Sequence, residues 1–381
     1  MNPALPDLQS EGQIQAQVNG CLGLLTLNRP QALNALSLAM VRDLATLLQH
    51  WAVNPQVQAV VLSGAARPGK AAAFCAGGDI RYFHQAVLAG DPSVDDFFTE
   101  EYALNLLIHQ YPKPVIALMD GVVMGGGMGI SQGARLRVLT EQSRLAMPET
   151  NIGLFPDVGG GHFLAACPGH VGEWLALTGD PILAGDAIAY GLGDVCIHSA
   201  DVQSLLRRLH EDPQPDADHV LSTVRACVAP TPPAASAHLR ERIDRHFGGP
   251  DLAAILASLA SAADAAVDAD GYTDDWARHT HATLLKRSPL MMAVTLEQVR
   301  RGRHLSLADD LRMERDLVHH CFHDRPGAAS ETMEGIRALA IDKDHRPSWN
   351  PASVAEVTPA MVQAYFVSPW LADRHPLRDL R

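Results

Sequence analysis

Hydrophobic and polar positions follow two different periods along the first half of the chain. An alternating segment and a short apolar run flank Asn19-Gly20, which predicts a β-hairpin over residues 13–27. Apolar residues at helical spacing then predict a helix over residues 37–51, and a continuous apolar run predicts a buried strand at residues 57–62. A strand, a helix and a strand in succession predict an α/β domain.

The same patterns continue to about residue 200. Further strands are expected at residues 114–119, 136–139, 144–147 and 195–198, and further helices near residues 98–111, 163–167, 172–178 and 184–190. Beyond residue 200, helical spacing covers much of residues 219–340, with proline-bearing linkers at residues 211–218 and 229–235 and no internal repeat. The pattern therefore predicts an α/β core over residues 11–200 and a mainly helical C-terminal region over residues 201–381.

Composition and charge restrict the function classes. The chain of 381 residues is 47% hydrophobic and carries a formal net charge of -13, with a pI near 5.7. A nucleic-acid binder needs a basic face, so this class is excluded, whereas a small anionic ligand needs only a few local cations. The six cysteines form no Cys-x-x-Cys pair, which indicates reduced thiols. Because no apolar run reaches membrane-spanning length and residues 1–13 contain no secretory signal, we expect a cytoplasmic protein without a membrane partner.

Two glycine-rich turns each follow a strand and precede a helix. The first, in residues 74–79, contains Gly77 and Gly78, and the second contains the glycine triplet at residues 125–127. Such turns can direct bare backbone N–H groups at an oxygen, and a helix N-terminus favours negative charge. The alternative is a pair of tight turns that serve only close packing. Neither turn is a nucleotide-binding fingerprint, because Ile130 stands where the last glycine would be and no Gly-Lys-Ser/Thr ending occurs.

The segment from Met147 to Gly161 contains two carboxylates, Glu149 and Asp157, among apolar residues. It fits neither a helix nor a strand, because its prolines and glycines interrupt any period. The plain interpretation is that a Pro-Glu pair starts a helix and a Pro-Asp pair starts a turn. The functional interpretation is that a loop of fixed shape with an apolar lining is a place where carboxylates do chemistry.

Three motifs resemble the crotonase (enoyl-CoA hydratase/isomerase) superfamily. They are Phe74-Cys75-Ala76-Gly77-Gly78-Asp79-Ile80, Gly125-Gly126-Gly127 and Pro148-Glu149, and Leu27-Asn28-Arg29-Pro30 with Ala35-Leu36 is similar to its N-terminal segment. Within the superfamily, residues 147–161 are similar to the 3-hydroxyisobutyryl-CoA hydrolase branch almost residue for residue. The same branch is resembled by Gly335-Ile336-Arg337-Ala338, Ile341-Asp342-Lys343-Asp344 and Pro347-Ser348-Trp349. The resemblance covers nearly the whole chain.

The resemblance implies a spiral of β-β-α turns that binds an acyl-CoA. Coenzyme A is then part of the substrate, and neither a separate cofactor nor a metal is expected. By motif position, the backbone N–H groups of Gly78 and Gly126 would bind the thioester oxygen, in agreement with two glycine turns that form an oxyanion hole. Arg29, Lys70 or Arg81 would contact the CoA phosphates, with a solvated charge as the alternative for each.

Two departures from the hydratase pattern favour hydrolysis. Hydratases of the superfamily carry a second glutamate where this chain has Gly129, and Asp157 matches an acidic position that the hydrolase branch carries and typical hydratases lack. The resemblance thus implies hydrolysis of 3-hydroxyisobutyryl-CoA to 3-hydroxyisobutyrate and CoA, as in valine catabolism. Glu149 would attack the thioester carbonyl or deprotonate the attacking water, and Asp157 would hold the 3-hydroxyl group or the leaving-thiol side. Glu101 matches a substrate-binding position of the branch, with an exposed helix charge as its alternative.

Other mechanisms stay open at this point. Residues 129–133 fit the Gly-x-Ser-x-Gly pattern of a serine-hydrolase elbow, but Ser131 falls inside an expected helix and not at a strand end. Cys75 lies beside the first glycine turn, although its apolar neighbours favour a packed thiol over a nucleophile. A hydratase or isomerase of the same superfamily and a non-catalytic acyl-CoA-binding protein are the remaining alternatives.

His319, His320 and His323 form a candidate metal-binding cluster. No third ligand stands at a defined spacing, so a solvated helix face is preferred. Superfamily members often form trimers or hexamers, but the helices after residue 200 could cover the surface that would otherwise pair. A homo-oligomer therefore stays open.

Overall fold

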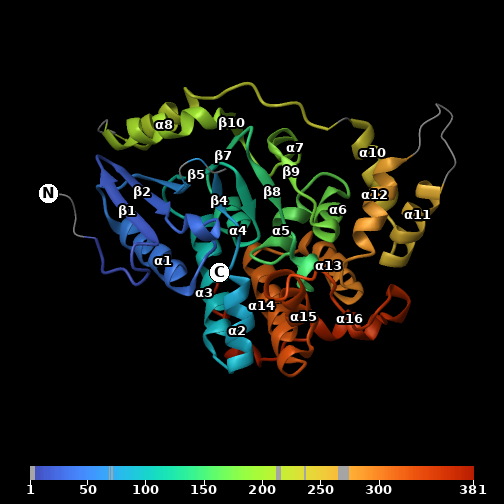
Figure 1. Cartoon of the computed structure of the whole chain (residues 1–381). Helices are drawn as coiled ribbons and strands as arrows, with labels where there is room; N and C mark the ends of the chain where they lie inside the picture. The colour runs from blue at the N-terminus through green and yellow to red at the C-terminus, as the bar shows by residue number, and fades with distance from the viewer. Residues whose placement is uncertain (1–4, 68, 70–71, 212–215, 236, 265–273) are drawn as a thin grey trace.

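The computed structural model describes residues 5–67, 69, 72–211, 216–235, 237–264 and 274–381 (Figure 1). The strands are β1 (Ile14–Asn19), β2 (Leu22–Leu27), β3 (Ala59–Gly64), β4 (Ala73–Cys75), β5 (Val115–Met119), β6 (Val122–Met124), β7 (Leu136–Thr140), β8 (Arg144–Ala146), β9 (Ile182–Leu183) and β10 (Val195–Ile197).

The α-helices are distributed over the whole chain and dominate its second half. They are α1 (Leu38–Val53), α2 (Ile80–Ala89), α3 (Ser93–His109), α4 (Gly126–Gln132), α5 (Gly160–Ala165), α6 (Val171–Thr178), α7 (Ala184–Ala189), α8 (Ser199–Glu211), α9 (Ala217–Arg225), α10 (Ala237–Phe247), α11 (Leu252–Asp264), α12 (Asp275–Leu284), α13 (Pro289–Gly302), α14 (Leu307–His323), α15 (Glu331–Ile336) and α16 (Pro359–Tyr365). The short helix η2 (Glu149–Ile152) carries one of the two candidate carboxylates.

The strands form two sheets. The larger sheet has the order β1-β2-β3-β5-β7-β10, and the smaller sheet has the order β4-β6-β8-β9. β1 and β2 form an antiparallel hairpin with Asn19 opposite Leu22, and the strands from β2 to β10 in the larger sheet run parallel. The predicted hairpin and buried strands are confirmed.

Successive turns of the chain contribute one strand to each sheet. β3 and β4, β5 and β6, and β7 and β8 are consecutive pairs, and in each pair the first strand joins the larger sheet and the second joins the smaller sheet. α2 follows β4, and α4 follows β6. This arrangement is the spiral of β-β-α turns that the resemblance implied, so the predicted α/β fold class is confirmed.

Two helices from the second half of the chain cover the outer face of the larger sheet. Val202, Leu205 and Leu209 of α8 and Val220 and Val224 of α9 are buried against apolar side chains of β2, β3, β5 and β7. Figure 1 shows α8 lying across this sheet. A parallel sheet that is buried on both faces explains why its strands have continuous apolar runs in place of alternating ones.

The later helices pack beside the spiral, next to the candidate site. α14 contacts α3 and α5, α13 contacts α5 and α6, and α15 contacts η2. One hydrophobic cluster contains Phe97 and Phe155 from the first half of the chain together with Met291, Leu311 and Ile336 from the second half. The division of the chain into a core of residues 11–200 and a C-terminal region of residues 201–381 stays a prediction. Within the described ranges, no helix has both the length and the apolar character needed to cross a bilayer.

The sequence pattern missed several short elements. β4, β6 and β9 contain two or three residues each, which is too short to give a hydrophobic period. α3 starts at Ser93 and not near residue 98, because Asp95 and Asp96 stabilise its first turn through the helix dipole. The predicted linker at residues 229–235 is irregular. Of the one at residues 211–218, residues 212–215 lie outside the described residues, whereas Glu211 ends α8 and α9 begins at Ala217, so the predicted bounds were too wide.

Candidate active site

Three loops with candidate chemistry meet at one edge of the smaller sheet. β4, β6 and β8 are parallel neighbours in that sheet, so their carboxyl ends lie side by side. The turn with Gly77 and Gly78 follows β4, the turn with Gly125 and Gly126 follows β6, and Glu149 follows β8. The strand order therefore brings together motifs that lie up to about seventy residues apart.

The backbone N–H groups of Gly78 and Gly126 are available to an oxygen. Leu36 donates to Gly77 O at 2.8 Å and accepts from the Asp79 N–H at 3.1 Å, so the Gly78 N–H points away from this bridge. Gly126 is the first residue of α4, and its N–H has no intrahelical acceptor. Neither N–H finds a backbone acceptor in the described part of the chain.

Close approach explains why these turns need glycine. Gly77 has φ +96°, and a Cβ on it would lie 3.3 Å from Gly126 N. A Cβ on Gly125 would lie 2.7 Å from Glu149 Oε1, and a Cβ on Gly126 would collide with Glu101 Oε1. The turns therefore pack closely, as expected if they served only close packing. However, they pack against each other and against the carboxyl groups of Glu101 and Glu149.

All five predicted site residues line one cavity of about 190 Å³. Gly78, Gly126, Glu101, Glu149 and Asp157 face it, and the apolar part of its wall consists mainly of Ile80, Phe83, Phe97, Phe98, Ile152 and Leu154. Glu101 is 2% exposed, so its alternative as a solvated helix charge is wrong. Glu149 is 7% exposed and Asp157 is 5% exposed.

Burial sets the electrostatics of this cavity. Burial raises the pKa of Glu149 and that of Glu101 well above the ordinary value, and the nearby Asp157 carboxyl adds to both shifts. Burial also raises the pKa of Asp157 to about 6, against the opposing effect of a hydrogen bond that it accepts. Carboxyls that share an apolar cavity cannot all be ionised, so protons are held there near neutral pH.

Tyr102 is a partner that sequence reasoning missed. Its hydroxyl donates to Asp157 Oδ2 at 2.8 Å, and the side chain is fully buried on α3. Burial raises the pKa of Tyr102 well above its ordinary value, and the charge of Asp157 adds to the shift, so the phenol stays a hydrogen-bond donor. The only signal in the sequence is its place directly after Glu101, because a buried tyrosine hydroxyl needs a partner that the sequence does not name.

The loop after η2 fills the space beside Gly129. A Cβ on Gly129 would lie 2.6 Å from Val158 Cβ. Val158 is buried and adopts a left-handed backbone, with φ +58°, directly after Asp157. The position at which hydratases carry their second glutamate is therefore closed by the residue that follows the second acid of this chain.

The two rival nucleophiles are excluded by their surroundings. Ser131 is fully buried inside α4, and its hydroxyl donates to Gly127 O at 2.8 Å, so it does not stand at a strand end as an elbow serine must. Cys75 is fully buried, and burial raises the pKa of its thiol to about 12. A thiol in this state is a packing residue. All six cysteines are free, as predicted.

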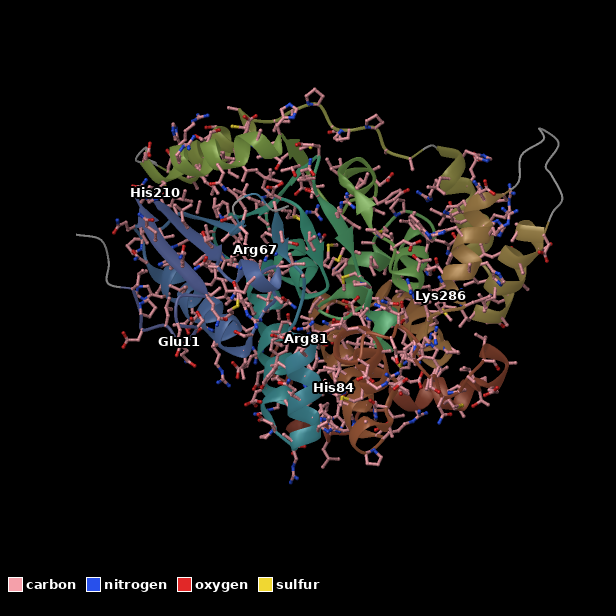
Figure 2. All side chains as sticks on the ribbon, viewed as in Figure 1. Glu11, Arg67, Arg81, His84, His210 and Lys286 are labelled. Atoms are coloured by element: carbon pink, nitrogen blue, oxygen red, sulfur yellow. The ribbon has the colours of Figure 1, made fainter. Side chains whose placement is uncertain are left out.

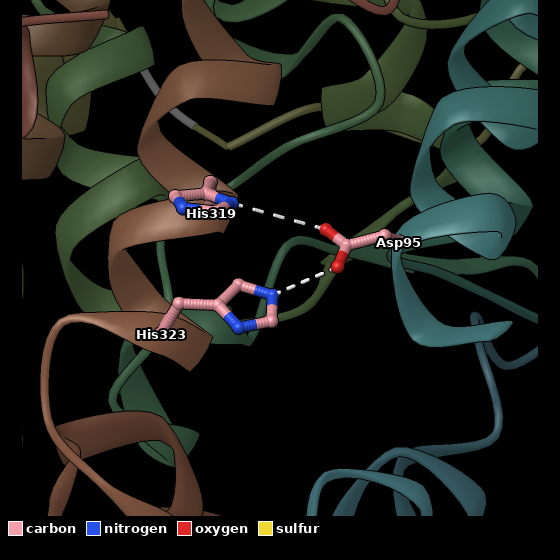
Figure 3. A group of neighbouring side chains, drawn as sticks. All are labelled: Asp95, His319 and His323. Carbon is pink, nitrogen blue, oxygen red and sulfur yellow. Dashed lines mark ion pairs between the residues drawn. The ribbon is translucent and has the colours of Figure 1, made fainter. Parts of the chain in front are cut away.

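The histidine cluster differs from its prediction as a solvated helix face. His319 and His323 of α14 face Asp95 of α3, and His323 Nε2 lies 3.0 Å from Asp95 Oδ2 (Figure 3). His320 is not part of the group, because its ring bonds to Asp324 at 2.9 Å.

The Asp95 carboxylate already has a strong cationic partner. The buried Arg315 lies 2.6 Å from Asp95 Oδ1. Burial opposes ionisation of Asp95, but His323, the more distant His319 and the charge of Arg315 hold its pKa well below its ordinary value. The cluster is therefore explained as an ion-pair network that joins α3 to α14.

The three basic side chains that were predicted to contact the CoA phosphates differ in their surroundings. Arg29 lies 2.7 Å from Asp79 and donates to Ala35 O, so its guanidinium is already engaged. Lys70 lies outside the described residues. Arg81 is exposed at the start of α2, directly after the cavity residue Ile80 (Figure 2).

A comparison with family models decides the relationship. The model described as enoyl-CoA hydratase/isomerase matches residues 22–366. The chain belongs to the enoyl-CoA hydratase/isomerase family. The match spans both the spiral and the later helices, so membership in the family extends over nearly the whole protein.

Named relatives place this family member in the 3-hydroxyisobutyryl-CoA hydrolase branch, as the motifs predicted. A protein of Xenopus tropicalis named 3-hydroxyisobutyryl-CoA hydrolase, mitochondrial, is 38% identical over 94% of this chain and 89% of its own length. A protein of Arabidopsis thaliana named probable 3-hydroxyisobutyryl-CoA hydrolase 3 is 33% identical over 94% of this chain and 92% of its own length.

Two solved structures share the fold of this family member along its length. A carnitinyl-CoA dehydratase from Mycobacterium thermoresistibile is 36% identical, with a TM-score of 0.82 over 93% of this chain and 96% of that chain. An enoyl-CoA hydratase from Rhodobacter sphaeroides is 35% identical, with a TM-score of 0.80 over 94% of this chain and 98% of that chain. Both proteins are named for reactions other than thioester hydrolysis, so the site residues must discriminate between these reactions.

Proposed function

We propose that the protein hydrolyses the thioester of 3-hydroxyisobutyryl-CoA, a short branched 3-hydroxyacyl-CoA, as a step of valine breakdown. The single observation that carries the proposal is that Asp157 and Glu149 line the same buried cavity. The names of the relatives from Xenopus and Arabidopsis support the same substrate. A free carboxylic acid and the CoA thiol are the products.

The first role belongs to the two glycine turns. The carbonyl oxygen of the thioester accepts hydrogen bonds from the N–H groups of Gly78 and Gly126, which stabilise the negative charge that develops on this oxygen. The apolar wall around the cavity excludes water and strengthens these bonds. Coenzyme A belongs to the substrate, and the mechanism uses no other cofactor.

The second role belongs to Glu149. In one route its carboxylate attacks the carbonyl carbon, the C–S bond breaks, and water then cleaves the mixed anhydride. In the other route Glu149 takes a proton from a water molecule that attacks the carbonyl carbon directly. Both routes consume one water molecule, and both need a proton on the sulfur of the leaving CoA.

The third role belongs to Asp157. Its carboxyl is held by the Tyr102 hydroxyl and has a pKa raised to about 6, so it is suited to exchange a proton near neutral pH. We assign it to the leaving sulfur or to the 3-hydroxyl group of the acyl chain. Glu101, in the same cavity, binds the acyl part of the substrate.

Hydration of a 2-enoyl-CoA is the competing function, because the two proteins of similar structure are named as a dehydratase and a hydratase. Ordinary hydration in this superfamily uses a second glutamate at the place of Gly129. A side chain there would collide with Val158, and this contact favours hydrolysis over hydration.

Recognition of the CoA phosphates and the state of assembly belong to the same proposal. Arg81 is the described candidate for a phosphate contact, because it is exposed beside the cavity. The state of assembly stays a prediction, with a homo-oligomer as the open alternative. A cytoplasmic location stays a prediction.

The proposal is tested by thiol release from 3-hydroxyisobutyryl-CoA and from a panel of other acyl-CoAs. We expect release with the wild type and a loss of at least about a hundredfold in Glu149→Gln, as for removal of an acid-base group or nucleophile. Glu100→Gln is the control. Glu100 is the α3 acid next to Glu101, and it pairs with Arg42 outside the cavity. Release from no thioester would contradict hydrolysis and favour an acyl-CoA-binding protein.

A further inference from the structure

The backbone around Asp157 is held by side chains from far along the chain. Glu314 of α14 accepts hydrogen bonds from the Gly159 N–H through Oε2 at 2.7 Å and from the Gly161 N–H through Oε1 at 3.0 Å. Gln298 of α13 donates through Nε2 to Pro156 O at 2.6 Å. These bonds hold the loop at Pro156, directly before Asp157, and at Gly159 and Gly161, shortly after it.

The two gripping side chains also bond to each other. Gln298 Nε2 donates to Glu314 Oε1 at 3.0 Å, and both side chains are fully buried. One amide group thus links the carbonyl before Asp157 to the carboxyl that binds the N–H groups after it. Asp310, one helical turn before Glu314, accepts from the His162 N–H at 2.8 Å and extends the contact along α5.

Burial of the two carboxyl groups that hold this loop costs free energy of folding. Burial raises the pKa of Glu314 well above its ordinary value, and the charge of Asp310 adds to this shift. Burial also raises the pKa of Asp310 to about 7, against the opposing effects of Glu314 and the His162 N–H. The loop they hold contains Val158 in a left-handed conformation with φ +58°, which a β-branched residue rarely adopts. Surroundings that over-determine a strained segment are typical of a functional site.

We propose that Glu314, supported by Gln298, is a positioning residue that fixes the Asp157 carboxyl in the cavity. This inference rests on the proposed function, because it assigns the purpose of the grip to Asp157. It also assigns a role to α13 and α14. These helices hold the loop that carries Asp157, so the α/β spiral alone does not place the second acid.

The test compares Glu314→Gln and Gln298→Ala with Glu297→Gln. Glu297 neighbours Gln298 on α13 but pairs with Arg301, so it is the matched control. Misplacement of a reacting group by about 1 Å costs roughly a hundredfold in rate. We expect kcat for thiol release to fall about ten- to a hundredfold in both test variants, with KM within about threefold of the wild type, and no change in the control.

A second readout does not depend on activity. Amide hydrogen exchange at residues 157–161 is expected to rise at least about tenfold in Glu314→Gln, while exchange in α3 stays as in the wild type. Faster exchange throughout the protein, or unchanged exchange with unchanged kcat, would overturn the assignment. If the wild type releases no thiol, the proposed function fails, and the exchange experiment still decides whether Glu314 holds this loop.

Discussion

At the scale of single residues, the site consists of three carboxyls with different neighbours in one apolar cavity. Glu149 lies against the second glycine turn, Asp157 accepts from Tyr102, and Glu101 lies against Gly126. The proposed division of labour rests on position: Glu149, beside the second glycine turn, acts on the thioester carbonyl, and Asp157 acts on the leaving group or the 3-hydroxyl.

Asp157 is expected to lower the stability of the folded protein at neutral pH. Its folded-state pKa of about 6 lies above the ordinary value of 3.8, so its protonated form favours folding, and this contribution is lost as the pH rises through about 6. Asp157→Asn should match the wild type near pH 4 and exceed it by about 3 kcal/mol in free energy of unfolding above pH 7.

Urea unfolding between pH 4 and pH 8 measures this difference. Asp379→Asn is the control, because that side chain is 90% exposed and should show no such pH-dependent gain. A constant difference between Asp157→Asn and the wild type across the pH range would contradict the burial of an ionisable Asp157.

The sequence predicted the five residues that meet in the cavity but not their supporting partners. Gly78, Gly126, Glu149 and Asp157 each lie next to a glycine or a proline in a contiguous motif, where local chemistry is readable, whereas Glu101 was predicted only from the resemblance. Tyr102, Gln298 and Glu314 belong to ordinary helical patterns, and their partners lie 55, 142 and 155 or 153 residues away. Such pairings are set by tertiary packing, which a single sequence does not encode as a local pattern.

At the scale of elements, the central contact is between α4 and the loop after η2. Gly129 of α4 and Val158 of the loop exclude each other's side chains, because a Cβ on residue 129 would lie 2.6 Å from Val158 Cβ. Gly129, the position where the resemblance implies the second glutamate of hydratases, therefore lies against the residue that follows Asp157. The sequence indicated both departures, but it could not show that they touch.

A double-mutant cycle tests this contact. Gly129→Ala should lower kcat/KM at least about tenfold, because it pushes Val158 and with it Asp157 out of place. The same substitution in a Val158→Gly background should cost much less, since glycine removes the side chain and suits φ +58°. The expected coupling is about 1–3 kcal/mol from kcat/KM. Additive effects of the two substitutions would contradict the contact.

At the scale of the whole molecule, the helices after residue 200 complete the protein on two sides. α8 and α9 bury the outer face of the larger sheet, while α13, α14 and α15 support the site from behind. Helical spacing predicted a helical region over residues 219–340, which contains α13, α14, α15 and most of α9, whereas α8 precedes this range and was not predicted. The periods could not reveal which face of the spiral each helix covers, since that depends on contacts remote in sequence.

A chain that ends at residue 200 is expected not to fold on its own. Its larger sheet would expose the side chains that α8 and α9 bury, and its site loop would lose Gln298 and Glu314. Circular dichroism and dispersion of amide signals by NMR, with the full chain as the control, measure the outcome. A cooperatively folded 1–200 fragment would show instead that residues 11–200 form an independent domain.

The central claim is that this family member cleaves a thioester and does not hydrate a double bond, and that Asp157 makes the difference. The most direct measurement follows thiol release from 3-hydroxyisobutyryl-CoA and hydration of a 2-enoyl-CoA side by side, with the wild type and Asp157→Asn. The expected result is thiol release without hydration in the wild type, and a loss of release of at least about a hundredfold in the variant. Hydration without thiol release, or full thiol release by Asp157→Asn, would contradict the claim.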